Sequence, residues 1–320
     1  MELNKMRFID LFAGIGGFRY ALESFGCKCV FSSEWDKYCQ ESYELNFHET
    51  PYGDITKIDE KDIPPFDILC AGFPCQPFSI SGNQKGFLDT RGTLFFDIVR
   101  IVKYHKPKVI FLENVKNLKA HNGGATFQII EKTLTDLNYT LYYKVLNAKN
   151  FGLPQNRERI AIVCIRKDID NKKFTFPNSY SNFVTIKDIK ETDDKTEKYV
   201  IQREDIFIDK KKLQKAILEG KVNRPVQIGT IGKGGQGNRI YHENGIGITL
   251  AASSGGAASK TGAYYINGRV RKLSPREAAR LQGFPEEFKI ISNENQALKQ
   301  FGNSVPINLL KEVVRGLERI

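Results

Sequence analysis

The sequence predicts an α/β fold: a doubly wound, mostly parallel, Rossmann-like sheet with a smaller irregular domain. Apolar, strand-sized runs alternate with helical patterns over about the first 165 residues, and this alternation is typical of a parallel sheet covered by helices. The alternation stops near Thr175, after which the chain becomes polar and rich in glycine. A length of 320 residues suffices for about two domains, which agrees with this break.

The elements of the first domain follow one another in a regular order. Each predicted strand is a short apolar run, and each predicted helix is an amphipathic stretch with a stop signal at its end. Ligands of such folds bind outside the carboxyl ends of the strands, where the Gly14 loop, Glu34, Cys75 and Glu113 are expected. The predicted strands are 7–12, 29–33, 66–71, 107–113, 140–147 and 159–166, and the predicted helices are 18–26, 36–46, 93–105 and 125–138.

The rest of the chain has a different pattern. Residues 185–220 are polar and charge-dense, and 223–250 read as short strands and glycine turns. Ser274-Pro275-Arg276-Glu277 is a capping box with proline at the first helical position, so a helix should begin there. A last helix, 306–317, should pack on the first domain. We therefore predict a first domain over 1–184, completed by 302–320, a second domain over 185–273, and a hinge over 274–301.

The charge is unevenly distributed. The formal net charge is +11, yet residues 1–67 hold 7 basic and 13 acidic residues, whereas residues 210–272 hold 12 basic and 2 acidic ones. A basic, glycine-rich segment indicates a polyanion partner, and a solvated basic face is the alternative. No apolar run reaches the 18 to 20 or so residues of a membrane span, and the N-terminus does not have the pattern of a signal peptide. Membrane proteins, secreted disulfide miniproteins and disordered chains are excluded as classes.

Cysteine and histidine spacing predicts no metal site. None of the 6 cysteines forms a C-x-x-C pair, and the 4 histidines are isolated. Five cysteines are expected to act as small apolar side chains in a reducing cytoplasm. Cys75 differs, because it follows a strand in the loop Gly72-Phe73-Pro74-Cys75-Gln76-Pro77, which two prolines and a glycine stiffen. Such a loop suits a positioned nucleophile.

A glycine loop, Phe12-Ala13-Gly14-Ile15-Gly16-Gly17, follows the first strand and opens a helix. Glu34 is placed where an acidic residue binds ribose hydroxyls in nucleotide-binding folds. The dinucleotide pattern fails, however, because Arg19 stands where the last glycine is needed. A nucleoside ligand without pyrophosphate fits better, with Trp35 packed on its purine. Taken alone, the loop is explained equally well as a tight turn.

Two further features favour chemistry at Cys75. A thiolate needs nearby cations, and Arg157 and Arg159 are candidates for supplying that field. A protonated Glu113 on the neighbouring strand could donate to a ring nitrogen; a helix-capping or ion-pairing role is the alternative. No histidine lies near these motifs, which disfavours a cysteine peptidase.

Six ordered motifs resemble those of the cytosine-C5 DNA methyltransferases. The resemblance covers nearly the whole chain and is far more specific than a glycine loop alone. The overall length and residues 232–241 look most like a bacterial restriction-modification methyltransferase that acts on GCGC. The motifs are Phe8–Gly17, Pro74-Cys75-Gln76, Glu113-Asn114-Val115, Gln155-Asn156-Arg157-Glu158-Arg159, Arg276-Glu277 with Gln282-Gly283-Phe284-Pro285, and Gly302-Asn303-Ser304-Val305.

The resemblance implies the S-adenosylmethionine-dependent methyltransferase fold and that cofactor, with S-adenosylhomocysteine as product and no metal. Phe12 would lie against the adenine, Glu34 would bind the ribose hydroxyls, and Asp54 would bind the adenine amino group. The cofactor residues that it implies are Phe12, Gly14, Gly16, Gly17, Glu34, Trp35, Asp54, Ile55, Pro74, Leu94, Asn303 and Ser304.

The resemblance also implies the reaction. Cys75 would attack C6 of a flipped-out cytosine, Glu113 would hold and protonate N3, and C5 would then take the methyl group. Arg159 would steady the cytosine, and Arg157 would contact its sugar-phosphate surroundings. Residues 185–273 would read DNA, with Gln236, Arg239 and Thr249 on the DNA face. Ser81 would contact DNA from the loop 75–91, whose glycines suit a lid that closes on DNA. The target would be the inner cytosine of GCGC, protected in a restriction-modification system.

The partner implied is double-stranded DNA, and a cognate endonuclease would act alongside the enzyme without binding it stably. The protein is expected to be a monomer in the bacterial cytoplasm, encoded by the bacterium or by a phage. The chain departs from the closest pattern at Pro77 and at Ala251-Ala252-Ser253-Ser254, which lacks an expected aromatic residue. Alternatives are a tRNA cytosine methyltransferase, which would carry Cys-Phe-Thr, a non-catalytic DNA-binding regulator, and a nicotinamide oxidoreductase.

Overall fold

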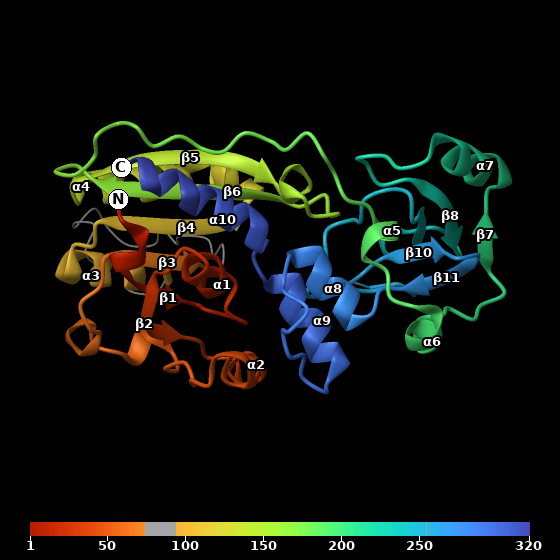
Figure 1. The fold of residues 1–320 in the computed structure, drawn as a ribbon, viewed down its shortest axis with the longest axis horizontal. Coiled ribbons are helices and arrows are strands. Elements are labelled where there is room, and N and C mark those ends of the chain that lie inside the picture. Colours follow the sequence, from red (N-terminus) through yellow and green to blue (C-terminus); the bar gives the residue numbers. More distant parts are fainter. Residues whose placement is uncertain (74–93, 254) are drawn as a thin grey trace. The chain divides into compact units, whose positions relative to one another are not determined.

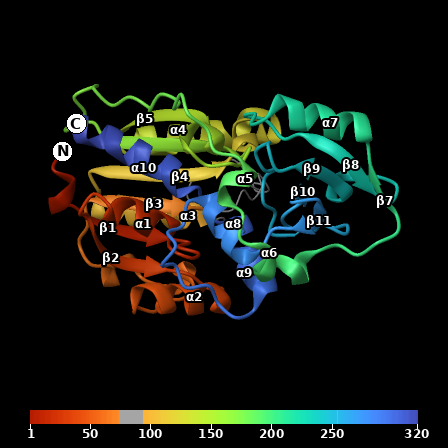
Figure 2. The same ribbon diagram turned by 45° about the vertical axis from the view of Figure 1, so that its right-hand side comes forward.

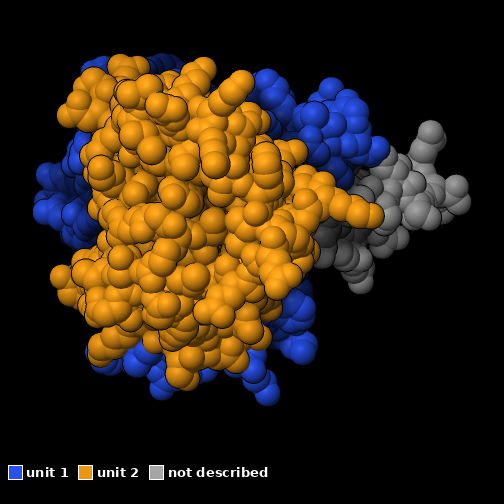
Figure 3. Space-filling model, turned by 90° about the vertical axis from the view of Figure 1, so that its right-hand side faces the viewer, with its two compact units in different colours: residues 1–146, 158–177, 310–320 blue, residues 147–157, 178–309 orange. Residues whose placement is uncertain are grey.

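The computed structural model describes residues 1–73, 94–253 and 255–320. The chain divides into two compact units, coloured separately in Figure 3. Unit 1 comprises Met1–Leu146, Glu158–Pro177 and Leu310–Ile320, and unit 2 comprises Asn147–Arg157 and Asn178–Leu309. Residues 147–157 and the stretch 274–309 thus belong to the second unit. The functional boundaries expected from the sequence stay a prediction, because compactness alone does not assign function.

Unit 1 is built on a six-stranded sheet of order β2-β1-β3-β4-β6-β5 (Figure 1). β1 pairs in parallel with β2 and β3, β3 pairs in parallel with β4, and β6 runs antiparallel to β4. This is the mostly parallel sheet that the sequence predicts. The strands are β1 (Arg7–Leu11), β2 (Lys28–Ser33), β3 (Ile68–Gly72), β4 (Val109–Val115), β5 (Tyr139–Asn147) and β6 (Glu158–Arg166).

Helices cover both faces of this sheet (Figures 1 and 2). On one face, α3 (Leu94–His105) and α4 (Ala125–Asp136) share a core with strand residues such as Ile110 and Leu112. On the other face lie α1 (Gly17–Glu23), whose Phe18 packs edge-on against Phe111, and α10 (Ile307–Gly316). Strands buried on both faces explain the continuous apolar runs of the sequence. α2 (Lys37–Phe47) follows β2.

Unit 2 contains a second sheet of five strands in the order β11-β10-β9-β8-β7. Its pairings are antiparallel except that β9 and β10 are parallel. The small core under this sheet includes Ile228, Ile240 and the buried Ala216 of α7 (Lys210–Glu219). The strands are β7 (Ile206–Ile208), β8 (Gln227–Ile231), β9 (Arg239–His242), β10 (Ala263–Ile266) and β11 (Arg269–Lys272).

Among the remaining helices, α8 (Pro275–Gln282) begins at the capping box that the sequence predicts at Ser274. The Ser274 side chain accepts from the backbone N–H of Glu277, and Pro275 occupies the first turn. α5 (Ile186–Ile189), α6 (Asp193–Thr196) and α9 (Glu294–Asn303) complete the set. The 3-10 helices are Leu3–Lys5, Ile55–Lys57, Glu60–Asp62, Lys116–Lys119, His121–Gly124, Ala148–Phe151, Glu197–Tyr199, Gln236–Asn238 and Leu317–Arg319. Among the described residues, no helix is long and apolar enough to cross a membrane.

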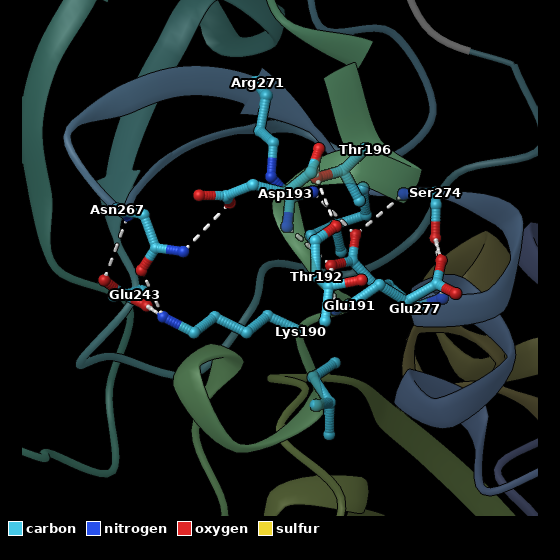
Figure 4. A network of polar contacts seen from close by, with 12 residues as sticks. Lys190, Glu191, Thr192, Asp193, Thr196, Glu243, Asn267, Arg271, Ser274 and Glu277 are labelled. Carbon is cyan, nitrogen blue, oxygen red and sulfur yellow. Dashed lines mark hydrogen bonds and ion pairs between the residues drawn. The ribbon is translucent and has the colours of Figure 1, made fainter. Parts of the chain in front are cut away.

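A buried ion pair joins the sheet of unit 2 to α8 (Figure 4). Arg271 donates from Nη1 and Nη2 to the Glu277 carboxylate over 2.7 and 2.6 Å. The same carboxylate accepts the backbone N–H groups of Ser274 and Glu191, each at 2.8 Å. Both charged side chains are at most 1% exposed. Glu277 therefore fixes three segments of unit 2 at one point.

Removing the charge of Glu277 should be strongly destabilising. Glu277→Gln leaves the buried Arg271 guanidinium without its carboxylate, and breaking a buried pair from one side costs about 3–5 kcal/mol. Urea unfolding at pH 7 measures the loss. The matched control is Asp136→Asn, which removes an exposed pair with Lys132 and should change the free energy of unfolding by less than about 1 kcal/mol. Equal effects of the two substitutions would contradict the structural role assigned to Glu277.

Candidate active site

The glycine loop between β1 and α1 adopts backbone angles that favour glycine. Gly14 and Gly16 have φ values of +56° and +83°. A Cβ on Gly16 would also lie 2.3 Å from the Phe47 ring. Phe12 has φ +57°, which is uncommon for a side chain of this size. The loop therefore makes a tight turn, closed by a hydrogen bond from the Gly16 N–H to the Ala13 carbonyl oxygen at 2.9 Å.

Glu34 closes this loop from the end of the neighbouring strand β2. Its Oε2 accepts the backbone N–H of Gly14 and its Oε1 accepts that of Asp36, both at 2.8 Å. Burial raises the pKa of the Glu34 carboxyl, and the two backbone hydrogen bonds act in the opposite direction. Trp35 is 78% exposed, so its ring is free to stack on a ligand. The structure thus brings together the loop, the acid and the aromatic residue that the sequence singled out.

The other residues predicted to bind the cofactor lie in several separate segments of the chain. Asp54 caps the short helix Ile55–Lys57, and hydrogen bonds from the hydroxyl and backbone N–H of Thr56 lower its pKa. Ile55 is buried in the core, and Leu94 is the half-buried first residue of α3. Asn303 and Ser304 belong to unit 2, at the end of α9. Pro74 lies outside the described residues.

The register of the sheet places Glu113 beside the strand that leads to Cys75. Gly72, the last residue of β3, pairs with Glu113 in β4. The Asn114 side chain donates to the Phe73 carbonyl oxygen at 2.8 Å and so holds the chain just beyond β3. Sequence reasoning did not assign this role to Asn114. Cys75 itself and Ser81 lie outside the described residues.

Glu113 and Arg159 form a largely buried ion pair, with 3.0 Å between Nε and Oε1. The antiparallel pairing of β4 with β6 produces this contact, because Val115 lies opposite Arg159 and Glu113 opposite Ala161. The side chains are 8% and 13% exposed. A carboxyl group and a guanidinium therefore lie together near the carboxyl end of β4. Such a pair can form hydrogen bonds with the ring nitrogens and exocyclic groups of a planar heterocycle.

Arg157 has different surroundings. It is 1% exposed, and its guanidinium donates to the carbonyl oxygens of Leu250, Gly302 and Ser304. All three of these acceptors are backbone oxygens of unit 2. Its expected contact with the sugar-phosphate surroundings of the cytosine stays a prediction.

The predicted DNA-reading residues of unit 2 lie on and near β9. Arg239 is the exposed first residue of β9, and Gln236 begins the short helix that precedes it. The Thr249 hydroxyl donates to the Asn156 carbonyl oxygen at 2.5 Å. The described residues contain no group of three or more His, Cys, Asp or Glu side chains that could hold a metal ion.

Beneath the glycine loop lies a carboxyl group that sequence reasoning missed. Asp10, the second-to-last residue of β1, is 1% exposed, and neither side-chain oxygen has a hydrogen-bond partner within the described residues. Burial raises its pKa well above the usual range, opposed by the charge of Arg19. An acidic residue inside an otherwise apolar strand was the available signal.

The order of this sheet, with a glycine loop closed by an acidic residue of the next strand, is consistent with the α/β fold of the S-adenosylmethionine-dependent methyltransferases, and the solved structure of S. pombe Dnmt2 shares this fold. Residues 6–319 match the family model of the C-5 cytosine-specific DNA methylases. The chain belongs to that family, and it is a DNA cytosine-5 methyltransferase. The predictions of fold class, family and enzymatic activity are confirmed.

Relatives and solved structures agree with this assignment. The chain is 52% identical over 312 residues to the type II methyltransferase M.HhaI of Haemophilus parahaemolyticus, covering 98% of this chain and 94% of that one. Identity to M.HaeII of Haemophilus aegyptius is 45% over 314 residues, covering 97% and 92%. Two solved structures share the fold at 20% identity. They are Dnmt2 of S. pombe, at a TM-score of 0.71 with 98% of each chain covered, and a prophage-encoded methyltransferase of E. coli described as a putative DNA modification enzyme, at 0.65 with 98% and 99% covered.

The buried Asp10 carboxyl should make Asp10→Asn increasingly stabilising as the pH rises. Because the folded-state pKa is raised above the unfolded value of about 3.9, wild-type protein loses stability as the pH rises towards the folded pKa. Asparagine does not titrate, so the stability of the variant relative to wild type should grow by up to about 1.4 kcal/mol per pH unit in that window. Urea unfolding between pH 4 and 8 measures the difference.

The control for Asp10→Asn is Asp54→Asn. The pKa of Asp54 is lowered, so the stability that its carboxylate contributes is present above the unfolded pKa and lost as the pH falls. The second variant should therefore lose stability slightly at neutral pH and match wild type in acid. A flat pH dependence of the Asp10→Asn difference would show that the carboxyl has a partner that stabilises its charge.

Proposed function

We propose that this enzyme transfers a methyl group from S-adenosylmethionine to C5 of the inner cytosine of GCGC in duplex DNA. The observation that carries the GCGC target is the 52% identity to M.HhaI, against 45% and 44% to M.HaeII and M.HpaII, together with the resemblance of residues 232–241 to GCGC-type enzymes. The methylated DNA is protected in a restriction-modification system. A cognate endonuclease acts on the same sequence without stable binding, and the methyltransferase works as a monomer in a bacterial cytoplasm, encoded by the bacterium or by a phage.

The cofactor fits the site formed by the loop and Glu34. The Glu34 carboxylate is held by the N–H groups of Gly14 and Asp36, which orients it towards the ribose hydroxyls of a nucleoside. Trp35 is exposed for stacking on the adenine, and Asp54 binds the adenine amino group. Phe12, Gly16, Gly17, Ile55, Pro74, Leu94, Asn303 and Ser304 complete the assigned set. When bound, S-adenosylmethionine supplies an electrophilic methyl group.

The reaction uses three side chains, Cys75 from the segment that follows β3 in the sequence, Glu113 of β4 and Arg159 of β6. The Cys75 thiolate forms a bond to C6 of the cytosine, while Glu113 binds N3 and supplies a proton to it, so that C5 becomes nucleophilic. C5 takes the methyl group and S-adenosylhomocysteine is left. A water molecule then removes the C5 proton, the thiolate leaves as the C5–C6 double bond returns, and N3 gives its proton back to Glu113. This mechanism is supported by the pairing of Gly72 with Glu113 and by the 3.0 Å contact between Glu113 and Arg159. In this proposal Arg159 holds the base in place.

The target base must leave the helix, because C6 of a stacked cytosine is out of reach of a thiolate. We propose that Gln236 and Ser81 enter the space that the flipped-out cytosine leaves in the duplex, each from a different groove. Arg239, whose guanidinium matches guanine O6 and N7, reads a neighbouring base pair, and Thr249 lies on the DNA face. The exposed position of Arg239 at the start of β9 supports this assignment.

The decisive experiment follows tritium from labelled S-adenosylmethionine into a duplex with one GCGC site. Wild-type protein should label this duplex and leave a duplex of equal composition without GCGC unlabelled. Cys75→Ser should transfer less than about one thousandth of the wild-type label, since the covalent step is lost. Label in both duplexes would overturn the GCGC assignment, and label in tRNA alone would overturn DNA as the substrate. A 5-fluorocytosine duplex should also trap wild-type protein covalently, but not Cys75→Ser.

Glu113→Gln should lower kcat by about 10²- to 10⁴-fold with little change in KM for DNA, because the proton donor for N3 is lost at the chemical step. Single-turnover kinetics with saturating cofactor measure the effect. Glu158→Gln is the matched control, because Glu158 lies on β6 beside Arg159 but pairs with the exposed Lys116. The control should keep kcat within about threefold of wild type. If both variants lose activity equally, Glu113 has no special part in the reaction.

A further inference from the structure

One arginine in unit 2 holds two segments that are far apart in the sequence. The guanidinium of Arg157 donates from Nη1 to the Leu250 carbonyl oxygen at 3.2 Å. It donates from Nη2 to the carbonyl oxygens of Gly302 and Ser304 at 3.0 and 2.7 Å. A planar guanidinium can serve several acceptors at fixed angles, whereas an ammonium group acts as a single point. Arg157 therefore fixes Leu250 relative to the turn at the end of α9.

The two segments also touch directly. A Cβ on Gly302 would lie 2.5 Å from the Ala251 carbonyl carbon and 2.6 Å from the Ala252 nitrogen. The obstacle is backbone, which cannot rotate away as a side chain can. Glycine is thus required at 302 for this contact, independently of its backbone angles. The peptide between Ala251 and Ala252 rests on the backbone of Gly302.

A second buried side chain holds the other backbone group of Leu250. Gln155 is 0% exposed, and its Oε1 accepts the Leu250 N–H at 3.1 Å. Its Nε2 donates to the Leu281 carbonyl oxygen at 3.0 Å. Both backbone groups of Leu250 are therefore satisfied by side chains of one short segment, 155–157. Shifting Leu250 alone would leave buried polar groups unpaired, which is strongly unfavourable.

We propose that Arg157 is a positioning residue that couples DNA binding at Thr249, beside Leu250, to cofactor binding at residues 303–304. This inference rests on the proposed function, which assigns Thr249 to the DNA face and Asn303 and Ser304 to the cofactor. Because one guanidinium binds the carbonyls next to both sets, the segments hold their positions together or lose them together. Linkage then requires that DNA and cofactor strengthen each other's binding by the same factor.

The first test uses wild-type protein and S-adenosylhomocysteine as the probe. Calorimetry without and with a saturating GCGC duplex should show that the duplex tightens binding by about 5- to 100-fold, the usual range of coupling. Hydrogen exchange should show that S-adenosylhomocysteine alone slows exchange of the Leu250 and Ala251 amides. If the probe does not bind at all, the proposed function fails. If it binds without slowing these amides, the coupling through Arg157 fails while the function stands.

The second test compares Arg157→Lys with Arg276→Lys. Lysine at 157 cannot serve three carbonyls, so the factor by which the duplex tightens probe binding should fall at least about fivefold. Arg276 is the matched control, because its guanidinium also donates to two backbone oxygens of unit 2, those of Pro285 and Phe288, at 3.3 and 2.7 Å. The control should keep the wild-type factor.

Two outcomes would overturn the proposal. One is an Arg157→Lys protein with the wild-type coupling factor. The other is a protein with weaker probe binding but an unchanged ratio with and without duplex, which a purely structural role would produce. If Arg157→Lys does not fold, Gly302→Ala decides, because it forces apart the Gly302 and Ala251 backbones with Arg157 intact. Gly302→Ala should lower the coupling factor by a similar amount, and wild-type coupling in that variant would contradict the inference.

Discussion

The geometry of the proposed active site depends on how β4 is paired on its two sides. Its parallel neighbour β3 ends opposite Glu113, so the chain that leaves β3 towards Cys75 starts beside that carboxyl group. Its antiparallel neighbour β6 brings Arg159 across from Val115, two residues farther along β4. A shift of one residue in either pairing would turn Glu113 or Arg159 to the opposite face of the sheet. The apolar residues that bury both faces of these strands therefore also set the geometry of the two side chains that are proposed to act on the base.

Short sequence signals, such as capping residues, predict the parts of the fold that depend on interactions between residues close together in the chain. The start of α8 follows from a serine cap, a proline and a glutamate within four residues, all of which act on the same turn. α7 and α9 were not predicted, because both are polar and bury few apolar side chains, such as Ala216 and Phe301. Their helical form comes from caps at Asp209 and Asn293 and from packing within unit 2. The antiparallel direction of β6 is likewise set by tertiary pairing, which strand composition does not show.

The charge count of the sequence predicts a negatively charged partner, but it overstates how many cations are available to that partner. Several cations of the basic segment 210–272 are bound by acids that precede it in the chain. Lys221 pairs with Asp188, and Arg269 pairs with Asp193 and Glu197. By contrast, the exposed Arg239 has no acidic partner in the part of the chain that the structure describes. The structure thus separates cations that stabilise unit 2 from cations that are available to a polyanion, a distinction that only three-dimensional contacts reveal.

The two arginines of Gln155-Asn156-Arg157-Glu158-Arg159 show how close in sequence these two uses can be. Arg157 is the last residue of its stretch in unit 2, and Glu158 begins the stretch that belongs to unit 1. Arg157 binds backbone oxygens, whereas Arg159 binds the carboxyl group of Glu113. The resemblance of this motif assigns both arginines to the reaction. The proposed roles of the two arginines have different physical consequences. A group that acts through carbonyl oxygens should change how two ligands influence each other's binding, whereas a group that holds the reacting base should change the rate of the chemical step.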